Sequence, residues 1–129
     1  MKKKAIIISL KGKILSKKEK LLLTNENPWG VILFERNIHT LRQTQKLIKQ
    51  IKKYSKSNNF PILIDEEGST VSRIKNIFKH KLNANNFGKV FEKDKKFAIS
   101  IYKSYLKSLC RLLKNIGFNI NTIPVLDVL

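Results

Sequence analysis

The sequence predicts an α/β protein with mostly parallel strands joined by crossover helices. Short aliphatic runs alternate with longer segments whose apolar residues recur at helical spacing. The run at residues 62–64 has no polar position, which is typical of a parallel strand buried on both faces. This alternation is the pattern of a parallel sheet, and both a doubly wound sheet and part of a barrel agree with it.

The first strand is expected at residues 5–10, and a helix follows it from Ser16 to Leu23. Ser16 with Glu19 three residues later is the pattern of a capping box, which satisfies free amides at a helix start. Residues 25–30 contain a proline and a glycine, so we expect a loop there.

The second strand is expected at residues 31–34, and Thr40 is the expected N-cap of the next helix. That helix is predicted from apolar residues at helical spacing, namely Leu41, Leu47, Ile48, Ile51 and Tyr54. The third strand is expected at residues 61–65, after a polar turn.

The connection after the third strand, residues 66–91, is too long for a simple turn and is expected to be functional or to contain local helices. The longest helix is predicted at residues 94–115, with Gly117 as its C-cap. Its apolar stripe consists of Ala98, Ile101, Tyr105, Leu109, Leu112 and Ile116. The fourth strand is expected at residues 118–128.

The formal net charge of +18 raises the question of nucleic-acid binding. The basic residues, however, are scattered along the chain, and they comprise 23 lysines and only 4 arginines. Arginine is the residue that reads phosphates and base edges best, so we interpret the lysines as solvated faces. We therefore do not expect a nucleic-acid partner.

The single cysteine, Cys110, allows no internal disulfide, which agrees with a reducing compartment. It falls in a helical pattern and is expected to be a small core residue. The apolar run after the N-terminal lysines is only four residues long, against the roughly 7 to 15 of a signal peptide. No apolar run approaches the roughly 20 residues of a membrane helix, so we expect a cytoplasmic protein without a membrane partner.

Three adjacent acids, Asp65, Glu66 and Glu67, follow the third strand, and Arg73 lies shortly after them. Such acids repel one another, and folding gains nothing obvious from them. The carboxyl ends of parallel strands are where open α/β sheets and barrels place their sites. We therefore expect a functional site here, with Asp65 and Arg73 converging on one pocket.

Three segments of the chain resemble family 3 glycoside hydrolases, specifically the bacterial β-N-acetylhexosaminidases of cell-wall recycling. Residues 30–37 resemble their G-x-I-L-F-x-R-N segment, and residues 64–73 resemble D-[QE]-E-G-G-x-V-x-R. Residues 116–128 resemble G-[IF]-[DN]-x-x-x-A-P-V-L-D-V, and the three segments keep the family's order and spacing. Ser69 replaces the second glycine of the middle pattern, which matters if that position needs a positive φ.

The resemblance implies that residues 1–129 are the N-terminal part, about the first half, of a TIM-like (β/α) barrel, since a closed barrel needs about 200 residues or more. It implies that Asp65 accepts hydrogen bonds from sugar hydroxyls in the −1 subsite, and that Arg73 is a second sugar contact. The nucleophile and the acid/base would lie beyond this chain, so no catalytic residue, cofactor or metal is expected within it.

The residues alone favour a different assignment. Asp65 and Glu67 fall two apart, on the same side of an extended strand, and glycosidases use paired carboxylates. In the family reading, Glu67 instead supports the site, where it could bond backbone amides of its own loop. Neither histidine fits the family's catalytic loop, so a surface or capping role is expected for His39 and His80.

The expected function is that of a retaining β-N-acetylhexosaminidase that releases N-acetylglucosamine from cell-wall-derived glycosides, with this chain alone inactive. The substrate would be a glycan that contains N-acetylglucosamine. One alternative is a truncated, non-catalytic barrel fragment, and a less favoured one is a basic nucleic-acid-binding module. The sequence predicts no oligomeric state.

Overall fold

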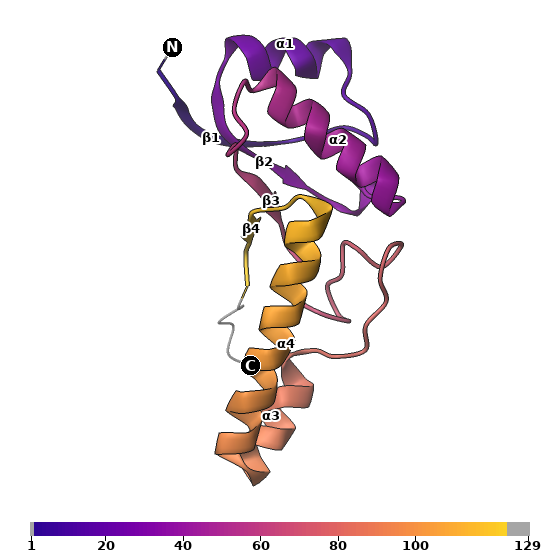
Figure 1. The fold of residues 1–129 in the computed structure, drawn as a ribbon, viewed down its shortest axis with the longest axis vertical. Helices are drawn as coiled ribbons and strands as arrows, with labels where there is room; N and C mark the ends of the chain where they lie inside the picture. Colours follow the sequence, from indigo (N-terminus) through magenta and orange to yellow (C-terminus); the bar gives the residue numbers. More distant parts are fainter. Residues whose placement is uncertain (1, 124–129) are drawn as a thin grey trace.

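The computed structural model describes residues 2–123, and its centre is one four-stranded parallel sheet (Figure 1). The strands are β1 (Lys4–Ser9), β2 (Pro28–Leu33), β3 (Ile62–Ile64) and β4 (Ile120–Asn121). They lie in the order β1-β2-β3-β4, so each new strand is added beside the previous one. A doubly wound sheet reverses its order at a switch point, whereas a barrel does not, so this sheet is wound like part of a barrel.

The strands are connected by helical segments, as the alternating pattern predicts. These are α1 (Lys17–Asn25), a short 3₁₀ helix η1 (Glu35–Asn37), α2 (Leu41–Tyr54), α3 (Ala84–Lys93) and α4 (Lys95–Ile116). The long connection after β3 does contain a local helix, α3, which packs along the start of α4 (Figure 1). No helix among the described residues is long and apolar enough to cross a membrane.

The N-caps of the first two helices lie where the sequence predicts them. The Ser16 hydroxyl accepts from the amide of Glu19 at 3.2 Å, and the Glu19 carboxylate accepts from the amide of Ser16 at 2.7 Å. Partial burial pushes the pKa of Glu19 upward, but the hydrogen bonds from Lys11 and Ser16 outweigh this and leave the pKa lowered. Thr40 caps α2 through the amide of Gln43 at 3.2 Å.

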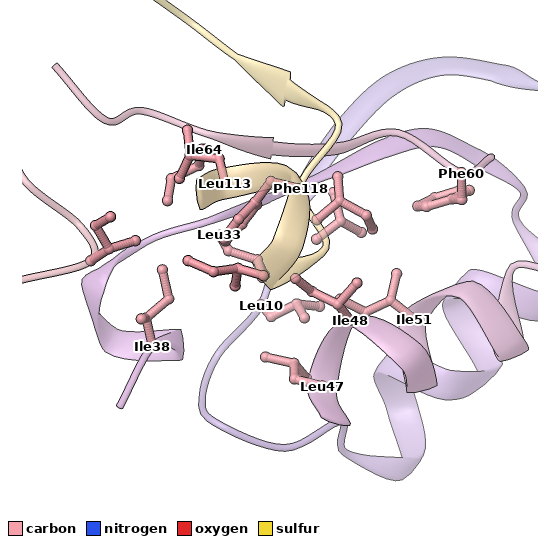
Figure 2. Packing of buried hydrophobic residues seen from close by; sticks show 14 of the residues in the cluster. Leu10, Leu33, Ile38, Leu47, Ile48, Ile51, Phe60, Ile64, Leu113 and Phe118 are labelled. Carbon is pink, nitrogen blue, oxygen red and sulfur yellow. The ribbon is translucent and has the colours of Figure 1, made fainter. Parts of the chain in front are cut away.

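The core lies where the helices cover the sheet. Figure 2 shows side chains of α2 and α4 gathered against those of β2 and β3. Val31, Leu33, Ile62 and Ile64 of the strands are fully buried, and so are Ile51 and Ile116 of the helices. All of β3 is buried, as an unbroken aliphatic strand requires.

The predicted loop at residues 25–30 is wrong, because Pro28, Trp29 and Gly30 belong to β2. Proline is tolerated there as the first residue of the strand. A Cβ on Gly30 would lie 2.9 Å from the Cβ of Pro61, so the glycine permits close approach of the neighbouring chain instead of breaking the strand.

One predicted core residue, Cys110, is exposed on α4. Leu41, one of the apolar positions from which α2 was predicted, is also exposed, in the first turn of that helix. Helical spacing gives the direction of an apolar stripe but not its width, so residues at the edge of the stripe are misassigned. The part of the predicted fourth strand beyond residue 123 lies outside the described residues.

Gly117→Ala should lower the free energy of unfolding by about 1–2 kcal/mol, because Gly117 has φ +122° and a Cβ there would lie 3.0 Å from Cγ2 of Ile48. Urea unfolding measures this change. Gly88→Ala is the matched control, since a Cβ on Gly88 meets nothing within 4 Å in the middle of α3. It should raise stability by up to about 1 kcal/mol. Equal effects of the two substitutions would contradict the assigned C-cap.

Candidate functional site

The carboxylate of Asp65 is fixed at the carboxyl end of β3. Its Oδ1 accepts from the Thr122 hydroxyl, which follows β4, at 3.0 Å. Its Oδ2 accepts from Nη2 of Arg73 at 3.0 Å. The Asp65 side chain remains 25% exposed, and each carboxylate oxygen can accept a further hydrogen bond. Asp65 is therefore an oriented acceptor that a polar ligand can still reach.

Arg73 lies in the loop after β3 and points back to this strand end. Besides its ion pair with Asp65, its guanidinium carbon lies 5.8 Å from the ring centroid of Phe34, the residue after β2. Its Nε is buried and makes no hydrogen bond to the described residues. The structure thus brings Asp65 and Arg73 together at the carboxyl edge of the sheet, while their roles toward a sugar stay predictions.

Glu66 is completely buried beneath this pair. Its Oε2 accepts from the amide of Arg73 at 2.7 Å and from that of Ile74 at 3.1 Å. Its Oε1 lies 2.9 Å from Nε2 of His80. A buried carboxylate is tolerable only with such partners. The carboxylate of Glu66 therefore holds two backbone amides of the loop that follows it.

The backbone of Glu66 is also tied to β4. Its amide donates to Oδ1 of Asn121 at 3.1 Å, and its carbonyl accepts from Nδ2 of Asn121 at 3.2 Å. Asn121 is the last residue of the two-residue strand β4. Its side chain therefore links the end of β4 to the backbone that follows β3. The sequence alone does not predict this contact, because Asn121 and Glu66 are 55 residues apart.

The loop after Glu66 turns sharply at Gly68. The amide of Glu67 donates to the carbonyl of Val71 at 2.9 Å, and that of Ser69 donates to the carbonyl of Leu82 at 2.9 Å. Gly68 has φ +131°, whereas Ser69 is not among the described residues with positive φ. The serine that replaces the second glycine of the family pattern is therefore accommodated without backbone strain. A supporting role for the Glu67 side chain remains a prediction.

The expected surface or capping role of His80 is wrong. Its side chain is only 7% exposed, and it lies between Glu66 and the hydroxyl of Tyr105, which is 3.3 Å from Nδ1. His39, in contrast, is exposed. Local sequence gives no signal for the difference, because the buried acid and the tyrosine that hold His80 come from other segments.

Arg36 and Asn37 of the first family segment have a structural task. Nε of Arg36 donates to the carbonyl of Leu10 at 2.9 Å. Asn37 is completely buried, and its Nδ2 donates to the carbonyls of Leu10 at 3.1 Å and Gly12 at 2.8 Å. Its Oδ1 accepts from the amide of Phe34 at 3.0 Å. These bonds fix the loops after β1 and β2 beside the candidate site.

A hollow of about 500 Å³ has Arg73 among its lining residues. Polar and basic residues line most of it, namely Glu35, residues 69–73, Lys75, Lys79, His80 and Lys81. Asp65 does not line this hollow, so the hollow is a neighbour of the Asp65 carboxylate and not its pocket. The described residues contain no group of three or more His, Cys, Asp or Glu side chains that could hold a metal ion.

Comparisons with known proteins agree with the fold, although no family model matches the chain. A β-hexosaminidase of Psychromonas ingrahamii is 31% identical over 124 residues, and one of Thioalkalivibrio sulfidiphilus is 27% identical over 123 residues. The structure of NagZ from Neisseria gonorrhoeae superposes on 98% of the chain with a TM-score of 0.85 and 26% identity. The chain is a relative of the bacterial β-hexosaminidases.

The match to these β-hexosaminidases covers nearly all of the chain but a minor part of each relative. It covers 95% of the chain, yet only 36% of the P. ingrahamii protein and 35% of the T. sulfidiphilus protein. It covers 38% of the NagZ chain, whose N-terminal domain is a TIM-like barrel. The predicted fold class, an α/β chain of parallel strands belonging to such a barrel, is confirmed.

Gly68→Ala should destabilise the loop by about 1–3 kcal/mol, because a Cβ at this φ would lie 2.6 Å from the carbonyl oxygen of Leu82. The measurement is amide hydrogen exchange at Ser69, whose amide donates to that carbonyl. Ser69→Ala is the matched control and should change stability by less than about 0.5 kcal/mol, since Ser69 is exposed. Equal exchange in the two variants would show that the turn does not depend on glycine.

Proposed function

We propose that this chain is the N-terminal, sugar-orienting part of a β-N-acetylhexosaminidase barrel of glycoside hydrolase family 3. The whole enzyme would release N-acetylglucosamine from cell-wall-derived glycosides by a retaining mechanism, and it would work in the cytoplasm during peptidoglycan recycling. The observation that carries the proposal is the fixed Asp65 carboxylate at the carboxyl end of a barrel strand. The NagZ relative forms a complex with N-trifluoroacetyl-D-glucosamine, which supports an amino sugar as the ligand.

Asp65 suits the recognition of vicinal hydroxyls. An ionised carboxylate accepts several hydrogen bonds, and hydrogen bonds to a charged group are stronger than those between neutral groups. Arg73 and Thr122 each occupy one oxygen of the carboxylate and so fix its plane before a sugar arrives. A preoriented acceptor loses less entropy on binding than a mobile one.

The same contacts make these acids poor catalysts. Retaining hydrolysis needs a nucleophile on one face of the sugar and a proton donor about 5–5.5 Å away. Glu66 is buried, with both oxygens engaged by the loop and His80, so it cannot reach a substrate. Asp65 is held by an arginine and a hydroxyl, which suits binding better than attack. We therefore place the nucleophile and the acid/base beyond this chain.

The purified chain should not hydrolyse a chromogenic N-acetylglucosaminide above the background rate. A chimaera, in which residues 2–123 replace the matching segment of N. gonorrhoeae NagZ, should hydrolyse it. The assay is release of the chromophore, with folding of both proteins checked by circular dichroism. A folded but inactive chimaera would favour the alternative of a non-catalytic barrel fragment. Turnover by the chain alone, abolished by Asp65→Ala or Glu67→Ala, would restore the strand-end acids as the catalytic pair.

In the chimaera, Asp65→Asn should lower kcat/KM by about 100-fold, the factor expected when about 3 kcal/mol of charged hydrogen bonding to the sugar is lost. Glu92→Gln is the matched control, because Glu92 is an exposed acid on α3, away from the strand ends. It should leave kcat/KM unchanged. Unchanged kinetics in Asp65→Asn would remove Asp65 from the sugar site.

A further inference from the structure

Three side chains connect helix α4 to the loop that carries Arg73. Oε1 of Glu66 lies 2.9 Å from Nε2 of His80, and Nδ1 of His80 lies 3.3 Å from the hydroxyl of Tyr105. The Glu66 side chain has no solvent exposure, and that of His80 has 7%. Water therefore cannot readily replace either partner if one of these bonds is broken.

Glu66 also links Arg73 to Asp65 at the candidate site. Glu66 holds the backbone amide of Arg73 at 2.7 Å. The Arg73 guanidinium then returns to the carboxylate of Asp65, the residue directly before Glu66. Because Glu66 fixes the point from which the arginine side chain starts, it also determines where the guanidinium can meet Asp65.

Tyr105, the residue of this connection on α4, packs against other aromatic rings. The ring of Tyr105 lies 5.2 Å from that of Phe87 on α3 and 6.4 Å from that of Tyr102 on α4. Burial raises the pKa of the Tyr105 hydroxyl, and the negative charge of Glu66 raises it further, so the hydroxyl keeps its proton. The hydroxyl can therefore donate to Nδ1 of His80 in the tautomer whose ring proton is on Nε2, the nitrogen that faces Glu66.

We propose that Glu66, His80 and Tyr105 are positioning residues that hold Arg73 against Asp65 and so make the orientation of the Asp65 carboxylate depend on helix α4. The effect on sugar binding rests on the proposed function. The hold on Arg73 does not, because every contact in the connection lies within the described chain.

The test is NMR of the isotope-labelled full chain without any sugar. Two signals report directly: the rotation rate about the Arg73 Cζ–Nη bonds, and hydrogen exchange of the Arg73 and Ile74 amides, which donate to Glu66. His80→Leu should accelerate both by about fivefold or more, the factor expected from loss of one hydrogen bond. Tyr105→Phe keeps the ring packing and removes only the hydroxyl, so it should give a smaller change in the same direction.

Two controls separate positioning from general stability. The chain has two histidines, and His39→Leu, at the exposed one, should leave both signals unchanged. Glu66→Gln keeps an oxygen that can accept from the amides and should retain slow Arg73 rotation, whereas Glu66→Met should lose it. Urea unfolding shows which variants remain folded, and the two single changes at His80 and Tyr105 suffice if Glu66→Met does not fold.

Unchanged Arg73 rotation in folded His80→Leu and Tyr105→Phe would overturn the proposal, as would an equal change in His39→Leu. Because no sugar is present, this failure is distinguishable from failure of the proposed function. That failure appears instead as unchanged hydrolysis in the Asp65→Asn chimaera.

Discussion

The structure of this site depends on one buried carboxyl group, that of Glu66. It has no solvent exposure, and burying a polar group without hydrogen-bond partners costs roughly 2–7 kcal/mol. The chain supplies these partners from its own loop, through the amides of Arg73 and Ile74 and the ring of His80. The loop must therefore fold back over the end of β3, and this return brings Arg73 to Asp65.

The sheet provides the frame for this arrangement. Strands in sequential order place the carboxyl ends of β3 and β4 side by side. Asn121 can therefore accept a hydrogen bond from the backbone of Glu66, and the Thr122 hydroxyl can donate one to Asp65. Fully buried residues of β2 and β3 pack against α2 and α4 and hold the strands in register. The fold thus fixes an acceptor at an edge where barrels bind their ligands.

Local features of this chain could be predicted from the sequence because their physical cause is local. The caps at Ser16 and Thr40 and the C-cap at Gly117 each depend on residues within one helical turn. The proximity of Asp65 and Arg73 followed from one rule about strand ends and from the family pattern. These features cover the fold class, the element order and the core of the candidate site.

The remaining features depend on partners that are distant in sequence. His80 is buried because Glu66 and Tyr105 lie on either side of it, and Gly30 belongs to a strand because it pairs with Ile7 of β1. The burial of Glu66 likewise depends on the amides of Arg73 and Ile74, which lie seven and eight residues further along the chain. A sequence pattern gives the type of such a residue, whereas its role depends on contacts with distant segments of the chain.

The most direct test of the central claim is a crystal structure of the NagZ chimaera with N-acetylglucosamine bound. We expect a sugar hydroxyl within hydrogen-bonding distance, about 2.5–3.0 Å, of an Asp65 carboxylate oxygen, with Arg73 still paired to that carboxylate. A sugar bound without contact to Asp65, or an Arg73 that leaves Asp65 and turns to solvent, would contradict it.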